Sequence, residues 1–259
     1  MSDMQSKFRF AVFFSMVLSA AAQAYPAHPD TLPDTLKVFC PPGDGSTGIP
    51  SEWKHVLPKK NRASTSYSIE RLNGEPYLRA VSSATDSWLE LDVGDIDVSE
   101  YPVMEWMWMV NQFPETEWEM NRENDDFAIR IELLYDYKGG KKNILNIVRK
   151  GLLKSVFMHY PPELVVDYVW SLNVPPEKAY RSPSAKNTMV IPIESDTVMQ
   201  GRWVRERRNI LDDLVSFNGE KTKLVLKKIR IRSDTESVPS VAESGLKYIY
   251  LIPETAGSE

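Results

Sequence analysis

Cysteine and histidine are scarce in this sequence of 259 residues. The single cysteine, Cys40, cannot form an internal disulfide, and we expect it to be a small buried residue. The three histidines, His28, His55 and His159, do not occur in zinc-ligand spacing, and the chain has neither HExxH nor CxxC. It also has no GxSxG or GxxxxGK[ST] segment. The sequence therefore gives no support to a zinc enzyme, a serine hydrolase or a P-loop nucleotide-binding protein.

The composition is that of an ordinary globular protein. Hydrophobic residues make up 42% of the chain and charged residues 26%, and the formal net charge is −5. A nucleic-acid partner requires a basic surface, so this mild acidity argues against one.

The amino-terminal residues have the pattern of a secretory signal peptide. Lys7 and Arg9 precede an apolar run over 10–22, which is short for a membrane span, and Ala22 and Ala24 frame a small-x-small cleavage site. We expect cleavage after Ala24 rather than an uncleaved anchor, with no transmembrane segment remaining and a periplasmic or secreted product. Residues 25–34 are Pro-rich and predict a flexible start, and residues 35–254 predict one domain.

Short apolar runs alternate with turn residues along the mature chain. The pattern predicts a mainly β protein: a jelly-roll-like antiparallel β-sandwich with one or two short helices. Asn73-Gly74 is a strong hairpin signal. The expected strands are 36–39, 66–71, 77–81, 88–91, 103–110, 127–135, 165–170, 188–193, 223–231 and 246–252.

Two segments have helical features. Residues 143–159 place apolar side chains at helical spacing, and Lys150 and Lys154 lie toward the other side. Such a basic amphipathic segment could contact a membrane or a protein partner, but covering an open end or face of a sheet is the commoner use. Residues 204–217 predict either a short helix or an irregular crossover.

Alternation assigns side chains to the two faces of the strands. We expect Trp106 and Trp108 to face the core, because charged residues occupy the opposite positions. We expect Arg130 and Glu132 to face solvent or a ligand. Glu105 would share a sheet face with Glu132 if their strands were neighbours.

The same residues supply the candidate ligand-binding set. Arg130, Glu132 and Glu105 can bind hydroxyl groups, and exposed aromatic rings can stack on sugars. Trp203 and Trp88, together with Trp53 and Trp118, lie near turns and are the freest to contact a partner.

Carboxylates allow two further interpretations. Asp126 and Glu132 could act as the carboxylate pair of a glycosidase, although solvated strand carboxylates are the commoner explanation. Asp125, Asp126 and Asp234 lie in oxygen-rich turns that could hold calcium. Acceptance of backbone hydrogen bonds is the plainer role for such residues.

Several motifs in the same order resemble DUF3047, an uncharacterised bacterial exported family. They comprise Tyr101–Trp108, Asp125–Arg130, Tyr168–Ser171, Gly201–Val204 with Glu206 and Arg208, and Asp234-Thr235. Met107 and Met109 stand where the family often has arginines, Asn209 replaces an aspartate, Glu236-Ser237 replace Asp-Asn, and 141–162 is longer than usual. The resemblance implies a jelly-roll sandwich similar to carbohydrate-binding modules and no known activity.

These observations favour an exported, non-catalytic protein that binds a polysaccharide or another envelope glycan. Two alternatives remain: a glycan hydrolase or lyase with paired carboxylates, and an envelope scaffold or assembly protein whose basic segment contacts a membrane or a partner.

Overall fold

The computed structural model describes residues 34–58, 63–115, 125–138, 162–219, 223–238 and 240–253. The predicted signal peptide, most of the Pro-rich start, Trp118 and the basic segment 143–159 lie outside these ranges.

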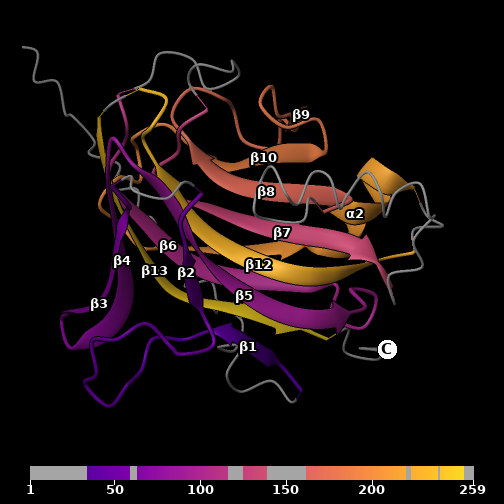
Figure 1. Cartoon of the computed structure of the whole chain (residues 1–259), viewed down its shortest axis with the longest axis horizontal. Helices are drawn as coiled ribbons and strands as arrows, with labels where there is room; N and C mark the ends of the chain where they lie inside the picture. The colour runs from indigo at the N-terminus through magenta and orange to yellow at the C-terminus, as the bar shows by residue number, and fades with distance from the viewer. Residues whose placement is uncertain are drawn as a thin grey trace, which may run out of the picture.

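Two β-sheets stack face to face (Figure 1). The first, sheet A, has the order β11-β6-β13-β4-β3, with β1 paired to β13 as well. Its strands are β1 (Leu36–Phe39), β3 (Ser66–Leu72), β4 (Glu75–Ser83), β6 (Val103–Gln112), β11 (Val204–Asn209) and β13 (Val241–Ile252). The β3–β4 hairpin turns at Asn73 and Gly74, which both have positive φ, as the sequence predicts.

Sheet B has the order β2-β5-β12-β7-β8-β10-β9 and is the sheet nearer the viewer in Figure 1. Its strands are β2 (Lys54–Val56), β5 (Asp86–Ile96), β7 (Arg130–Tyr137), β8 (Leu164–Ser171), β9 (Tyr180–Arg181), β10 (Thr188–Ser195) and β12 (Leu224–Asp234). All neighbours are antiparallel except β8 and β10, which run parallel. The jelly-roll-like, mainly β sandwich is thus confirmed, with one parallel pair in an otherwise antiparallel fold.

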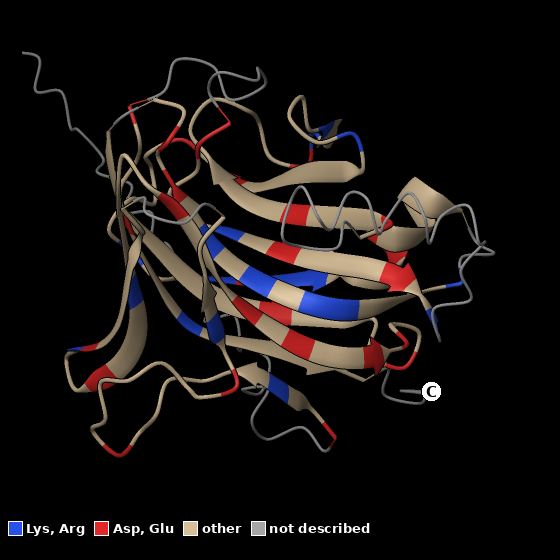
Figure 2. Cartoon of the chain, viewed as in Figure 1, with Lys and Arg blue, Asp and Glu red and all other residues tan. Residues whose placement is uncertain are grey.

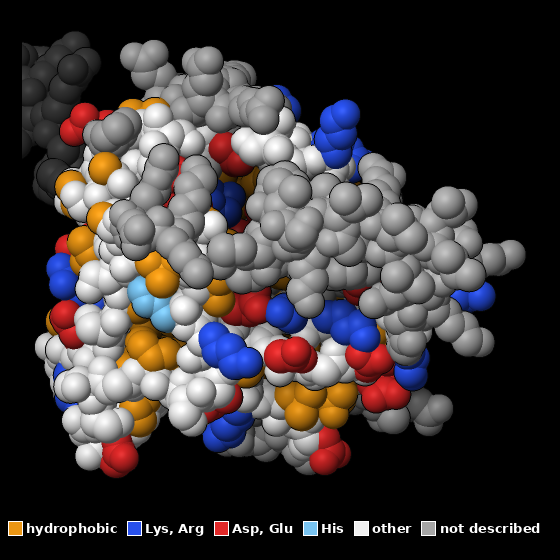
Figure 3. Space-filling model, in the orientation of Figure 1, with side chains coloured by type: hydrophobic (Ala, Val, Ile, Leu, Met, Phe, Trp, Pro, Cys, Tyr) orange, Lys and Arg blue, Asp and Glu red, His pale blue; other side chains and the backbone are white. Residues whose placement is uncertain are grey.

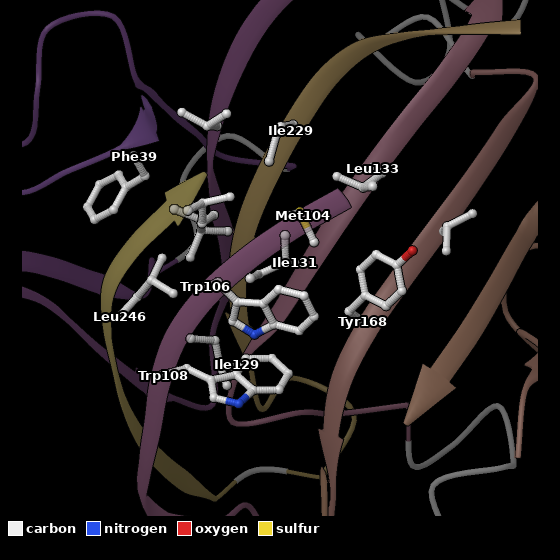
Figure 4. Close-up of a cluster of buried hydrophobic side chains, with 14 of the residues drawn as sticks. Phe39, Met104, Trp106, Trp108, Ile129, Ile131, Leu133, Tyr168, Ile229 and Leu246 are labelled. Atoms are coloured by element: carbon white, nitrogen blue, oxygen red, sulfur yellow. The ribbon is translucent and has the colours of Figure 1, made fainter. Parts of the chain in front are cut away.

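Aromatic side chains fill the space between the sheets (Figure 4). Trp106 and Trp108 of β6 are fully buried and point toward β8, where Tyr168 and Trp170 meet them at ring-centroid distances of 5.6 and 5.9 Å. The predicted core position of these two tryptophans is therefore confirmed. Burial of rings of this size is a major contribution to the stability of the sandwich.

A second apolar cluster covers the outer face of sheet A. Tyr248 and Tyr250 stack there at 4.7 Å and pack against Met107 and Val103. Cys40 belongs to this cluster and is only half-buried, with its thiol 3.5 Å from the Tyr250 hydroxyl. The expectation that Cys40 is buried is therefore met only in part.

The segment 204–217 begins as strand β11 and continues as α2 (Ile210–Asn218). The Asn209 side chain accepts hydrogen bonds from the backbone N–H groups of Leu211 and Asp212, which caps the helix. Asp213 of α2 accepts a hydrogen bond of 2.7 Å from the Tyr168 hydroxyl and a bidentate pair from Arg208. These bonds hold α2 against one end of the sandwich. Among the described residues no helix is long and apolar enough to cross a membrane.

Candidate functional site

Charged residues recur along the central strands of sheet B, with basic residues on β12 between acidic residues on β5 and β7 (Figure 2). On β12 the core-facing residues Ile229 and Ile231 alternate with outward-facing Lys228, Arg230 and Arg232. The strands on either side carry acids at half of the matching positions, namely Glu90 and Asp92 on β5 and Glu132 on β7. The alternation that places isoleucines in the core therefore also gives this sheet a charged outer face. Figure 3 shows basic and acidic side chains side by side on this face.

Strand register sets the partners within each row. Arg230 lies between Glu90 of β5 and Glu132 of β7, and Glu132 in turn lies opposite Asp167 of β8. Arg230 donates to Glu90 at 2.8 Å and to Glu132 at 3.3 Å. Arg232, one row along, donates to Glu132 at 3.4 Å. Glu132 is therefore held between two guanidinium groups.

Arg130 is the centre of a buried ion network. Its Nη2 donates to both carboxylate oxygens of Asp234, at 2.7 and 2.6 Å, and to the backbone carbonyl of Asp125 at 2.8 Å. Its Nη1 lies 3.7 Å from Asp167. Burial alone would lower the pKa of Arg130, but the facing carboxylates, Asp234 foremost, raise it above the ordinary value. Arg130 is thus a permanent cation.

A cavity of about 320 Å³ opens over these residues. Arg130, Arg230, Arg232 and five acidic residues line it, with small polar side chains from the β9–β10 region. Its volume is at the lower end of the range for ligand sites, about 300–1,000 Å³. Acids outnumber arginines, so the lining favours a neutral or basic ligand over a polyanion.

Three buried polar atoms in this lining have no hydrogen-bond partner among the described residues: Asp125 Oδ1, Asp167 Oδ1 and Arg130 Nε. Burial raises the pKa of Asp167 well above its usual range, and the neighbouring charge of Glu132 raises it further. Burial likewise raises the pKa of Asp125. Buried polar atoms without hydrogen-bond partners cost free energy, so these two acceptors and one donor are unsatisfied polar groups gathered at one cavity.

The predicted solvent exposure of Arg130 and Glu132 is wrong. The two residues are only 3% and 4% exposed, because neighbouring charged side chains on the same face pack over one another. Their predicted position opposite the core face is nevertheless where the structure places them, and both line the cavity.

Glu105 lies elsewhere, because β6 belongs to sheet A and β7 to sheet B. It is fully buried on the outer face of sheet A, where Arg205 Nε and Nη2 donate to it at 2.8 and 2.9 Å and Tyr248 donates at 3.2 Å. The condition under which Glu105 would share a face with Glu132, namely that their strands are neighbours, is therefore not met.

None of the described tryptophans that the sequence suggests for stacking on a ligand has a fully exposed ring. Trp88 is buried beneath Arg230, whose guanidinium carbon lies 4.7 Å from the ring centroid, and Trp53 is buried in the core. Trp203 is half-buried on the side of sheet A, with Tyr77 at its edge and Lys247 over its ring. Stacking on Trp88 or Trp53 is thus excluded by their burial.

The three candidate calcium ligands separate into different roles. Asp234 binds Arg130, and Asp126 accepts backbone N–H groups of Ser237 and Val238 at 3.2 and 2.8 Å. Asp125 lines the cavity. Within the ranges that the structure describes, no three His, Cys, Asp or Glu residues gather in a metal-binding group. The plainer role of backbone acceptor fits Asp126.

Sequence reasoning missed Asp167, Arg230 and Arg232 as site residues. Asp167 is the one charged residue in the apolar strand LVVDYVWS, and a lone charge in a buried strand signals a special role. Arg230 and Arg232 alternate with isoleucines in β12, which is the same signal that identified Arg130 and Glu132.

The fold and the cavity define a two-sheet sandwich with a charged ligand-sized site on one outer face. The sequence pattern of the family described as "Protein of unknown function (DUF3047)" matches residues 51–250, and the chain belongs to this family. No curated protein matches the chain.

Solved structures with similar folds include glycoside hydrolases of family 12. Endoglucanase of Rhodothermus marinus is 9% identical with a TM-score of 0.39, over 78% of this chain and 98% of that one. Endoglucanase 3 of Trichoderma harzianum is 7% identical with a TM-score of 0.38, over 78% and 98%. The K2 cleaved adhesin domain of Lys-gingipain is 11% identical with a TM-score of 0.35, over 85% and 98%. These are distant likenesses of fold alone.

Proposed function

We propose that this chain is an exported protein that binds a glycan in the cavity on the outer face of sheet B. The observation that carries the proposal is the set of buried atoms without a hydrogen-bond partner at one cavity: one carboxylate oxygen, Oδ1, of Asp125 and of Asp167, and the Nε of Arg130. A sugar presents hydroxyl groups that both donate and accept, so one sugar unit can satisfy acceptors and a donor at once. Hydrogen bonds to charged groups are worth about 1.5–3 kcal/mol each.

The charge balance narrows the ligand class. Each cavity arginine is already paired with carboxylates, such as Arg130 with Asp234 and Arg230 with Glu132. Little positive charge is left for a sulfate, phosphate or uronate group. We therefore propose a neutral or amino-bearing polysaccharide or envelope glycan as the ligand.

The test is a glycan array followed by calorimetry on the best neutral or amino-bearing binder. Asp167→Asn is expected to weaken binding about 10- to 100-fold, because an amide NH2 replaces one carboxyl oxygen in the cavity while the shape is kept. The matched control is Asp86→Asn on the same face: Asp86 is buried and bonded to Arg232 but lies outside the cavity lining. Failure of the wild-type protein to bind any array glycan, or equal losses in the two variants, would overturn the proposal.

Export is proposed on the leader pattern of residues 1–24 and has its own test. The chain expressed in a Gram-negative host should be recovered outside the cytoplasm with Tyr25 as its first residue. Recovery of the uncleaved chain in the cytoplasmic fraction would contradict this.

A further inference from the structure

Two carboxylates face each other across neighbouring strands in the cavity. Glu132 of β7 and Asp167 of β8 are direct register partners, both line the cavity, and they are 4% and 3% exposed. Residues directly opposite in an antiparallel pair have Cβ atoms roughly 4.5–5.5 Å apart. The two side chains therefore leave the sheet side by side and enter the same cavity, where a pair of carboxyl groups can act on one bond of a bound ligand.

The two carboxylates lie in different environments. Glu132 accepts hydrogen bonds from Arg230 and Arg232, one at each of its oxygens, so its negative charge is stabilised. Asp167 Oδ1 has no protein partner in the described chain, and the closest cation to its Oδ2 is Arg130 at 3.7 Å. Burial raises the pKa of Asp167, and the neighbouring charge of Glu132 raises it further. Two adjacent carboxyl groups in such different environments can divide the roles of acid and nucleophile between them.

We infer that Glu132 and Asp167 hydrolyse a glycosidic bond of the glycan bound in this cavity, with Asp167 as the general acid and Glu132 as the nucleophile. This inference rests on the proposed function. In the first step the Asp167 carboxyl gives its proton to the glycosidic oxygen as the C1–O bond breaks, and Glu132 forms a bond to C1. In the second step water attacks C1, its proton passes to Asp167, and Glu132 is released. The net reaction adds one water and retains the configuration at C1.

A second carboxylate pair in the molecule does not compete for this role. Glu194 of β10 and Glu206 of β11 also lie together, but neither lines the cavity of the site. Asp126, which the sequence suggests as a partner of Glu132, is bonded to the backbone of 237–238 and does not line the cavity either. The facing pair on β7 and β8 is therefore the one that a bound sugar can reach.

The activity test uses soluble neutral glucans, xylans, chitosan and peptidoglycan, with new reducing ends as the readout. The wild-type protein is expected to release them. Glu132→Gln should reduce release at least 10³-fold, and Asp167→Asn about 10²- to 10⁴-fold, as for loss of a general acid. Asp92→Asn should retain activity within about threefold, because Asp92 is an exposed residue of β5 outside the cavity lining and its side chain accepts from the backbone N–H of Gly94. Thermal unfolding of each variant checks that it is folded.

A trapping experiment identifies the nucleophile without relying on any variant. The wild-type protein is incubated with 2,4-dinitrophenyl 2-deoxy-2-fluoro glycosides of glucose, galactose, mannose and xylose. Intact mass should rise by one fluoroglycosyl group, and peptide mapping should place that group on Glu132.

The outcomes separate the two proposals. Glycan binding by wild-type protein with no reducing ends and no trapped sugar overturns hydrolysis and leaves the binding function standing. A label on another residue overturns the assignment of Glu132. Absence of both binding and product overturns both proposals.

Discussion

Glu206 provides a test of how burial in this sandwich changes protonation. It lies on β11 of sheet A and shares a hydrogen bond with Glu194 on β10 of sheet B, and it accepts from Trp108 Nε1 at 3.3 Å. Burial raises the pKa of Glu206 to about 7, and the charge of Glu194 contributes to this rise. The folded chain therefore binds a proton at Glu206 more tightly than the unfolded chain does.

The sign of the pH effect follows from linkage. The stabilisation from protonated Glu206 is fully present below the unfolded pKa, 4.5, and is lost as the pH rises through about 7. A difference of this size between the folded and unfolded pKa of Glu206 corresponds to a free energy of at most about 3 kcal/mol. Partial exposure of the Glu206 side chain reduces this free energy to about 1–2 kcal/mol. Above about pH 7 the stabilisation from protonated Glu206 is fully lost, and stability no longer changes with pH through this group.

The perturbation is Glu206→Gln, whose amide cannot ionise but can still accept from Trp108. At pH 8 the variant is expected to exceed the wild type in unfolding free energy by about 1–2 kcal/mol, and near pH 4 the two should agree. The assay is urea denaturation at several pH values, followed by tryptophan fluorescence. The exposed turn residue Glu100 supplies the control, Glu100→Gln. A difference between Glu206→Gln and wild type that does not change from pH 4 to pH 8 would refute the reasoning.

Two further changes test the packing around the sheets. Asp234→Ala removes the carboxylate whose two oxygens accept from the buried Arg130. We expect the unfolding free energy, measured by urea denaturation, to fall by about 3–5 kcal/mol. A loss under about 1 kcal/mol would mean that the ion network is not buried as described. Gly245→Ala would place a Cβ 2.9 Å from the Trp203 ring and 3.1 Å from Tyr77, so we expect a loss of about 1–3 kcal/mol and altered tryptophan fluorescence, whereas an unchanged spectrum and stability would count against this close approach.

The sheet architecture could be predicted because alternation is local information. In β6 and β7, every second residue is a large apolar side chain, so Trp106, Trp108, Ile131 and Leu133 could be assigned to the core. The Asn73-Gly74 turn fixed one hairpin by conformational preference alone. Strand β11 was harder to predict, because VRERRN has a charged composition that does not alternate and its pairing with β6 is a long-range effect.

The site could be predicted only in part because alternation identifies a face and not its neighbours. It placed Arg130 and Glu132 opposite the core, but it could not show that β12 lies beside β7 and covers Glu132 with Arg230 and Arg232. The same lack of pairing information left open whether the strands of Glu105 and Glu132 are neighbours, and the structure places them in different sheets. The burial of Trp88 under Arg230 likewise depends on the β5–β12 register.

Strand β8 contributes Val165 and Asp167 to the cavity lining and is buried along its whole length. All its residues are buried, on both faces, between antiparallel β7 and parallel β10. Backbone amides in such a strand exchange with deuterium only when the whole molecule opens, whereas those of edge strands such as β3 can exchange through local fraying. Strand β8, which carries Asp167, should therefore keep its conformation at any denaturant concentration that leaves the protein folded. A ligand that binds in the cavity would meet this part of the surface already formed.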